Sequence, residues 1–256
     1  MTSELLGGVA RCSITPALGI RLAGYTVQQD FANAVHSELT ATALCLSDGT
    51  AAGTTVIMGL DILFIQNPAC DEIRQQIGAR LGIEPTNVML NFSHTHLAPM
   101  TGWYSEGGVD AEEWPPSGHA PTVPSDEWRQ QTASGIWSAF GCQCNIQSRY
   151  LDSLRDSLTA VAAAAHGALT PCRVGSATGS SELGVNRRLQ LPDGRTIIGI
   201  NHEGIIDRAV DVIRVDALDG ETIATVANCN INANFVFEFS TENAEMMWEL
   251  PLQKKR

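Results

Sequence analysis

A strand–helix–strand pattern in the first hundred residues constrains the fold of this chain more than any other feature. The run TTVIMGL (54–60) is short and apolar, as in a buried strand, and NVMLNF (87–92) repeats the pattern. Between them Asp71 is a suitable helix cap and Gly82 a suitable helix end. The intervening apolar residues recur every fourth position: Ile73, Ile77 and Leu81. This βαβ-like unit predicts an α/β protein with a mixed β-sheet and packed helices, in which the strand at 87–92 is central and buried.

Further strands and one long helix are predicted on both sides of this unit. A helix is expected over 150–169, because apolar residues such as Leu151, Leu154 and Leu158 line one face. Alternating or apolar runs bounded by turn residues indicate strands at 9–15, 39–46, 210–215 and 222–227.

Residues 101–149 show no helical or strand period and are rich in Gly, Pro, Ser and Trp. A segment of this length is unusual inside a compact domain, so it is either a functional lid or a poorly specified insert. We expect 101–145 to be less ordered than its flanks.

Charge excludes some classes of partner. The formal net charge of -12 leaves no basic stripe for nucleic acid, and it gives no electrostatic attraction to an anionic membrane, so a lipid substrate would be held by apolar contacts. No apolar run is long enough to span a membrane. The N-terminus lacks the features of a signal peptide and the seven cysteines are scattered, which predicts a cytoplasmic protein with buried thiols, or a secreted one if the true N-terminus is missing.

The segment Asn91-Phe-Ser-His94-Thr-His96-Leu-Ala-Pro99 carries the main chemical signal. Two histidines two residues apart at a strand end lie on the same side of an extended backbone, an arrangement that many metal sites use. Such pairs also occur as ordinary surface or hydrogen-bonded histidines. Their position beyond a buried strand favours a functional role.

Six ordered segments resemble the neutral/alkaline non-lysosomal ceramidase family, over about residues 7–228 with a gap at the long loop. They are GVARCSITPALGIRLAGY (8–25), VHSELTATALCLSDG (35–49), MGLDILFI (58–65), LGIEPTNVMLNFSHTHLAP (81–99), VNRR (185–188) and IDRAVDVIRVD (206–216). The resemblance implies a ceramidase-type catalytic domain with Zn²⁺ as its cofactor and a role in sphingolipid metabolism. The implied reaction is hydrolysis of the N-acyl bond of ceramide or a related lipid amide.

The resemblance also implies roles for three residues. His94 corresponds to a zinc ligand, His96 to an acid/base or carbonyl-polarising group, and Arg187 to the arginine that meets the polar head of the substrate. Zinc lowers the pKa of its bound water to about 7, and an imidazole and a guanidinium stabilise the oxyanion.

Other polar residues have simpler explanations. Without the resemblance, Arg187 and Arg188 read as surface charges. A structural or surface role suffices for His36, His166 and His202. Asp61 ends a strand, where it is either a partner of a metal ligand or the acceptor of a strand-end hydrogen bond.

The resemblance ends after Asn228, which divides the chain into a ceramidase-like part (1–228) and a divergent tail (229–256). Asn232 stands near the position expected for a second zinc-binding histidine, and no histidine follows His202. We therefore expect an incomplete domain in which zinc binding is weak or absent. The alternative to an amidohydrolase is a non-catalytic truncated fragment, and another type of metallohydrolase ranks last. The sequence makes no prediction of oligomeric state or acyl-chain preference.

Overall fold

The computed structural model describes residues 4–20, 22–23, 32–65, 67–101 and 137–230. The divergent tail beyond 230, and most of the loop predicted at 101–149, lie outside these ranges.

Seven of the described strands form one mixed sheet, which confirms the predicted fold class. In chain order they are β1 (Leu6–Ser13), β2 (Thr40–Ser47), β3 (Thr55–Leu60), β4 (Val88–Phe92), β5 (Thr170–Ser180), β8 (Ala209–Ala217) and β9 (Thr222–Cys229). The order in space is β4-β3-β2-β1-β5-β8-β9. β3 and β4 are parallel, as a βαβ unit requires, and every other pair is antiparallel.

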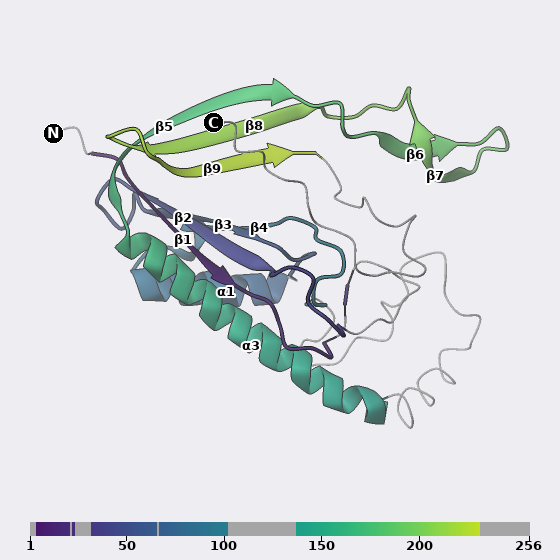
Figure 1. Ribbon diagram of the computed structural model, residues 1–256, viewed down its shortest axis with the longest axis horizontal. Helices are drawn as coiled ribbons and strands as arrows, with labels where there is room; N and C mark the ends of the chain where they lie inside the picture. The colour runs from purple at the N-terminus through teal and green to yellow at the C-terminus, as the bar shows by residue number, and fades with distance from the viewer. Residues whose placement is uncertain (1–3, 21, 24–31, 66, 102–136, 231–256) are drawn as a thin grey trace.

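Two helices, α1 (Asn67–Leu81) and α3 (Trp137–Gly167), cover one face of β1–β4 (Figure 1). Short η1 (Pro85–Asn87) leads from α1 into β4. Most of the apolar positions that recur along both helices are buried against the strands, and Leu81 and Leu151 are half-buried, which confirms the helical periodicity in the sequence. The core includes Met58 and Val56 from the sheet, Ile73 and Ile77 from α1, and Leu154, Leu158 and Val161 from α3.

The second half of the sheet turns back over the face that the helices leave open (Figure 1). β5 pairs with β1 through two residue pairs only, Leu6 with Pro171 and Gly7 with Thr170. Beyond them β5, β8 and β9 form an outer layer, and a small second core of Leu44, Cys172 and Val215 fills the space between the layers. β1 is thus enclosed by α3 on one side and by the outer layer on the other.

A glycine pair allows this close packing around β1. A Cβ atom on Gly8 would lie 2.8 Å from the carbonyl carbon of Ala168 and 2.9 Å from the backbone nitrogen of Leu169, at the end of α3. A Cβ atom on Gly7 would lie 3.0 Å from both Cys172 Sγ and Val215 Cγ1. Neighbouring residues of a strand face opposite sides of the sheet. Gly8 therefore allows the end of α3 to approach β1 on one side, and Gly7 allows the outer layer to approach on the other.

Two of the predictions on the fold are wrong. β4 is an edge strand rather than a central one, and its Met89 side chain is 54% exposed, whereas Val88 and Leu90 are buried. Helix α3 begins at Trp137 rather than at Tyr150, so the C-terminal part of the predicted loop is helical. Once a packed helix exists, each further residue adds a hydrogen bond without a new nucleation cost. The helix can therefore include 137–149 although apolar residues do not recur there with a helical period.

Burial of the cysteines leads to a prediction on their reactivity. Desolvation raises the pKa of the Cys45 thiol from 9.0 to about 11, while Cys229 at the end of β9 is exposed. Alkylation requires the thiolate, so iodoacetamide at pH 8 should modify Cys229 in the native protein and Cys45 only after unfolding. Mass spectrometry of tryptic peptides measures this order. Equal labelling of both cysteines in the native protein would contradict the buried position of β2.

Candidate functional site

The His94-Thr95-His96 segment lies directly past the C-terminal end of β4, as predicted. Hydrogen bonds attach it to the end of β3. The Ser93 N–H donates to the Leu60 carbonyl oxygen at 3.0 Å, and the Thr95 N–H donates to the Ile62 carbonyl oxygen at 3.3 Å. The Ser93 hydroxyl also donates to Leu60 O at 3.1 Å and lies 2.6 Å from the Thr95 hydroxyl.

A second chain segment fixes the other side of this loop. The Leu97 N–H donates to the Ala23 carbonyl oxygen at 3.0 Å, and the Ala23 N–H donates to the Ala98 carbonyl oxygen at 2.8 Å. Leu22 and Pro99 form an isolated β-bridge. The histidine loop is therefore fixed by backbone hydrogen bonds on two sides, which is the rigid support that a functional site needs.

The backbone at the histidines is a turn, and not the extended continuation of β4 that the sequence suggested. His94 has φ 55° and Leu97 has φ 61°, both in the left-handed region that non-glycine residues rarely adopt. This conformation costs roughly 1–2 kcal/mol per residue, and the hydrogen bonds on both sides of the loop offset it. Backbone outliers of this kind are concentrated at functional sites.

The turn brings the two imidazoles together with different surroundings. Their ring centroids are 5.1 Å apart, in an edge-to-face arrangement with an interplanar angle of 67°. His94 is exposed and His96 is half-buried, while Thr95 between them is 8% exposed. The pair thus presents one accessible imidazole and a second one in the protein surface behind it.

Asp61 takes the simpler of its two possible roles. Its Oδ2 atom accepts a hydrogen bond from the Thr40 N–H at 2.9 Å and another from the Thr40 hydroxyl at 2.6 Å. The Asp61 N–H in turn donates to the Thr40 carbonyl oxygen at 3.0 Å. This side chain therefore joins the end of β3 to the start of β2.

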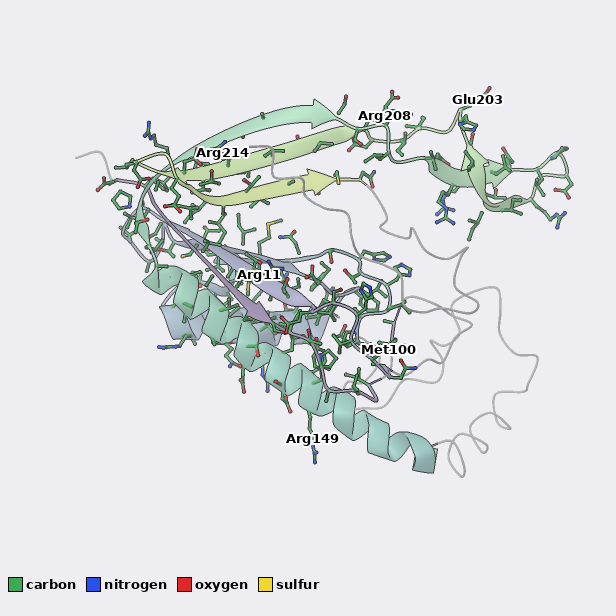
Figure 2. The ribbon with its side chains drawn as sticks, in the orientation of Figure 1. Arg11, Met100, Arg149, Glu203, Arg208 and Arg214 are labelled. Atoms are coloured by element: carbon green, nitrogen blue, oxygen red, sulfur yellow. The ribbon has the colours of Figure 1, made fainter. Side chains whose placement is uncertain are left out.

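Arg187 lies in a different part of the molecule from the histidine pair. It is exposed on β6 (Asn186–Gln190), which pairs with β7 (Thr196–Asn201) in a separate two-stranded sheet. This hairpin projects from the far end of the outer layer, beyond β5 and β8 (Figures 1 and 2). Among the other histidines, His36 and His202 are exposed, and His166 is half-buried near the end of α3.

The described residues do not form a complete metal site. Nowhere in the described ranges do three or more His, Cys, Asp or Glu side chains lie close enough to hold one metal ion. A catalytic zinc site takes three protein ligands, and the histidine pair offers at most two. These residues alone therefore do not fit a catalytic zinc ion.

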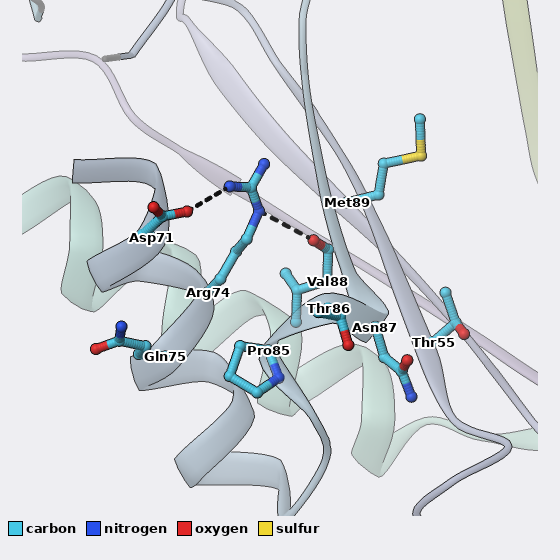
Figure 3. Close-up of a pocket in the computed structure, with 9 residues that line it drawn as sticks. All are labelled: Thr55, Asp71, Arg74, Gln75, Pro85, Thr86, Asn87, Val88 and Met89. Atoms are coloured by element: carbon cyan, nitrogen blue, oxygen red, sulfur yellow. Dashed lines mark hydrogen bonds and ion pairs between the residues drawn. The ribbon is translucent and has the colours of Figure 1, made fainter. Parts of the chain in front are cut away.

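A groove of about 680 Å³ opens at the opposite end of β4, between α1, η1 and the sheet edge (Figure 3). Its cationic side chain is already engaged: Arg74 Nη1 lies 2.9 Å from Asp71 Oδ1, and Arg74 Nε donates to the Val88 carbonyl oxygen at 3.3 Å. The second bond caps part of the exposed edge of β4. The groove is therefore a structural feature of the edge, away from the histidines.

The sequence indicated the histidine pair but not the residues that hold it. Ser93 and Thr95 make side-chain hydrogen bonds that help to fix the loop. The sequence feature that could have identified them is their alternation with His94 and His96. The pairing with residues 22–23 involves backbone groups and so left no mark on the side-chain pattern.

Comparison with known proteins supports the fold. No protein-family model and no curated protein matches the chain. A solved ceramidase complexed with C2 is similar, with a TM-score of 0.62 and 18% identity, over 90% of this chain and 31% of that chain. The neutral ceramidase of Pseudomonas aeruginosa gives a TM-score of 0.60 and 18% identity, over 90% of this chain and 32% of that one. The predicted ceramidase-type fold is thereby confirmed, and the chain spans about a third of the length of these structures.

Proposed function

We propose that this chain forms part of the catalytic domain of a zinc-dependent amidohydrolase, which cleaves the N-acyl bond of ceramide or a related lipid amide. One observation carries the proposal: a His-Thr-His loop, fixed on both sides, follows β4 in a ceramidase-type fold. Loops beyond strand ends on a rigid scaffold are where catalytic groups collect.

The surroundings of the two histidines support separate roles. His94 is exposed and held in a strained turn, which suits a metal ligand whose position is fixed. His96 stands beside it at 5.1 Å between ring centroids, and its proposed role is to act on the substrate carbonyl. Arg187 is proposed to meet the polar head of the lipid. The remaining zinc ligands have to come from outside the described residues.

A non-catalytic role is the second candidate. The absence of a three-ligand cluster within the described ranges favours it. In that case the chain would keep the fold and the histidine loop but bind zinc no better than a surface histidine pair.

Hydrolysis of a fluorogenic ceramide distinguishes the two candidates. Two proteins would be assayed side by side. One is the 256-residue chain, and the other is the longest protein that contains these residues and is encoded by the same transcript. We expect turnover by a longer protein, loss of turnover after removal of the metal with a chelator, and recovery with Zn²⁺. We expect no turnover and only weak zinc binding by the 256-residue chain, because its described residues bring no third ligand to the histidine pair.

Each assay has an outcome that contradicts one part of the proposal. Turnover that resists the chelator would show that the reaction does not depend on zinc. An inactive longer protein would favour the non-catalytic role. Stoichiometric zinc binding and turnover by the 256-residue chain would show that its ligand set is complete.

A further inference from the structure

The β6–β7 hairpin and its flanks expose an unusual number of aliphatic side chains. Six of the thirteen large exposed hydrophobic residues in the described part of the chain lie between 183 and 205. They are Leu183 (72% exposed), Val185 (45%), Ile197 (41%), Ile198 (78%), Ile200 (58%) and Ile205 (95%). A soluble surface usually shows such residues singly, and a cluster of them indicates a binding surface.

The hairpin cannot cover these side chains itself. Ile198 stands opposite Arg188, and Ile197 stands opposite Leu189, so both faces of the two-stranded sheet carry aliphatic groups. A two-stranded sheet without a packed face is only marginally stable in water. Polar links hold its shape instead: Asn201 Nδ2 donates to the Arg188 carbonyl oxygen at 3.0 Å, and Asn186 Nδ2 donates to the Ile205 carbonyl oxygen at 2.9 Å.

The charge of this segment is opposite to that of the rest of the chain. Residues 183–205 contain three arginines (187, 188 and 195) and two carboxylates (Asp193 and Glu203), a net charge of +1 in a chain of -12. Arg195 is paired with Asp193 at 2.8 Å. No ion pair is found for Arg187 or Arg188 among the described residues. The exposed aliphatic groups therefore lie beside two guanidinium groups that no described carboxylate pairs.

We propose that the β6–β7 hairpin, with its flanks from 183 to 205, docks on the surface of a phospholipid bilayer. The isoleucines enter the region between headgroups and acyl chains, and the Arg188 guanidinium group contacts a lipid phosphate. A bilayer fits both features, because it takes up aliphatic groups and attracts cations, while the acidic remainder of the chain stays in water. The choice of a lipid surface over a protein partner rests on the proposed function, in which the substrate is a lipid.

Co-sedimentation with vesicles of phosphatidylcholine and phosphatidylserine, free of any amide lipid, tests the docking. We expect the full chain to bind, and Ile198→Ser/Ile200→Ser to weaken binding by about tenfold, because two exposed aliphatic groups are lost. Arg188→Gln should weaken binding by about fivefold, as expected for the loss of one cation near an anionic surface. The matched control, Met89→Ser/Leu218→Ser, removes side chains of 54% and 51% exposure elsewhere and should bind as the unchanged chain does.

Several outcomes would overturn the proposal. They are failure of the unchanged chain to sediment with vesicles, binding by the isoleucine variant equal to that of its control, and unchanged binding by Arg188→Gln. A dimer in solution that Ile198→Ser/Ile200→Ser converts to a monomer would assign the hairpin to contact with a second copy. Because no amide bond is cleaved in this assay, its failure is distinct from failure of the hydrolase proposal.

Discussion

His94→Ala is expected to lower zinc-dependent hydrolysis by more than about a hundredfold in the longest protein that contains this chain. Loss of a residue that merely supports a metal ligand costs 10–100-fold, and loss of the ligand itself costs more. Zinc content after dialysis, measured beside ceramide turnover, should fall together with activity. His96→Ala should reduce turnover and leave the zinc content unchanged, since we propose that it acts on the substrate.

The strained backbone at His94 calls for a control of its own. Asparagine tolerates the left-handed region better than most residues, so His94→Asn keeps the φ of 55° and removes only the imidazole. It should be as inactive as His94→Ala and keep the stability of the native protein. His166→Ala, near the end of α3, should leave both the activity and the stability unchanged. Full activity of His94→Asn would mean that the ligand assignment is wrong.

Gly8→Val is expected to lower the free energy of unfolding by about 3 kcal/mol or more. The new side chain would meet backbone atoms of Ala168 and Leu169 at 2.8 and 2.9 Å, and a helix end cannot move away as a flexible side chain can. A loss of this size is a large part of the net stability of a typical domain. Urea unfolding followed by circular dichroism measures the change.

Gly59→Val is the matched control, because it introduces the same side chain in the same layer of the sheet. A Cβ atom at Gly59 in β3 would have no neighbour within 4 Å, and the backbone there is ordinary strand. Valine is also favoured over glycine in strands. The control should therefore be neutral or slightly stabilising. Equal losses for both variants would show that β1 does not lie tightly against the end of α3.

Sequence patterns predicted the elements that bury an apolar face and missed those that do not. The strands predicted at 39–46 and 54–60 and the helix at 150–169 all contribute to the main core. β5 was not predicted, because Cys172 is its only buried residue and Gly175 and Gly179 interrupt it. β4 was predicted to be central because Val88, Met89 and Leu90 form a continuous apolar run, which is typical of a strand buried on both faces. In the structure Met89 lies on the exposed face.

The candidate site was predictable in its residues and not in its shape. The spacing of His94 and His96 and the preceding apolar run placed the pair correctly at a strand end. The turn at His94 depends on contacts with residues 22–23 and 60–62, which are distant in sequence and made by backbone atoms. No side-chain pattern records such contacts. The separation of Arg187 from the pair follows from the outer layer; the sequence predicted two of its strands, at 210–215 and 222–227, but not their position over β1–β4.

The narrow junction between β1 and β5 has a consequence for the order of folding. Two residue pairs join the layers there, and Thr170 Oγ1 donates to the Gly7 carbonyl oxygen at 3.4 Å across a separation of 163 residues. Closing so large a loop costs chain entropy before many contacts repay it, whereas β2 and β3 are neighbours in sequence. The layer of β1–β4 with α1 can therefore assemble first, and α3 and the outer strands add to it late, the outer strands as a unit nucleated by the β8–β9 hairpin.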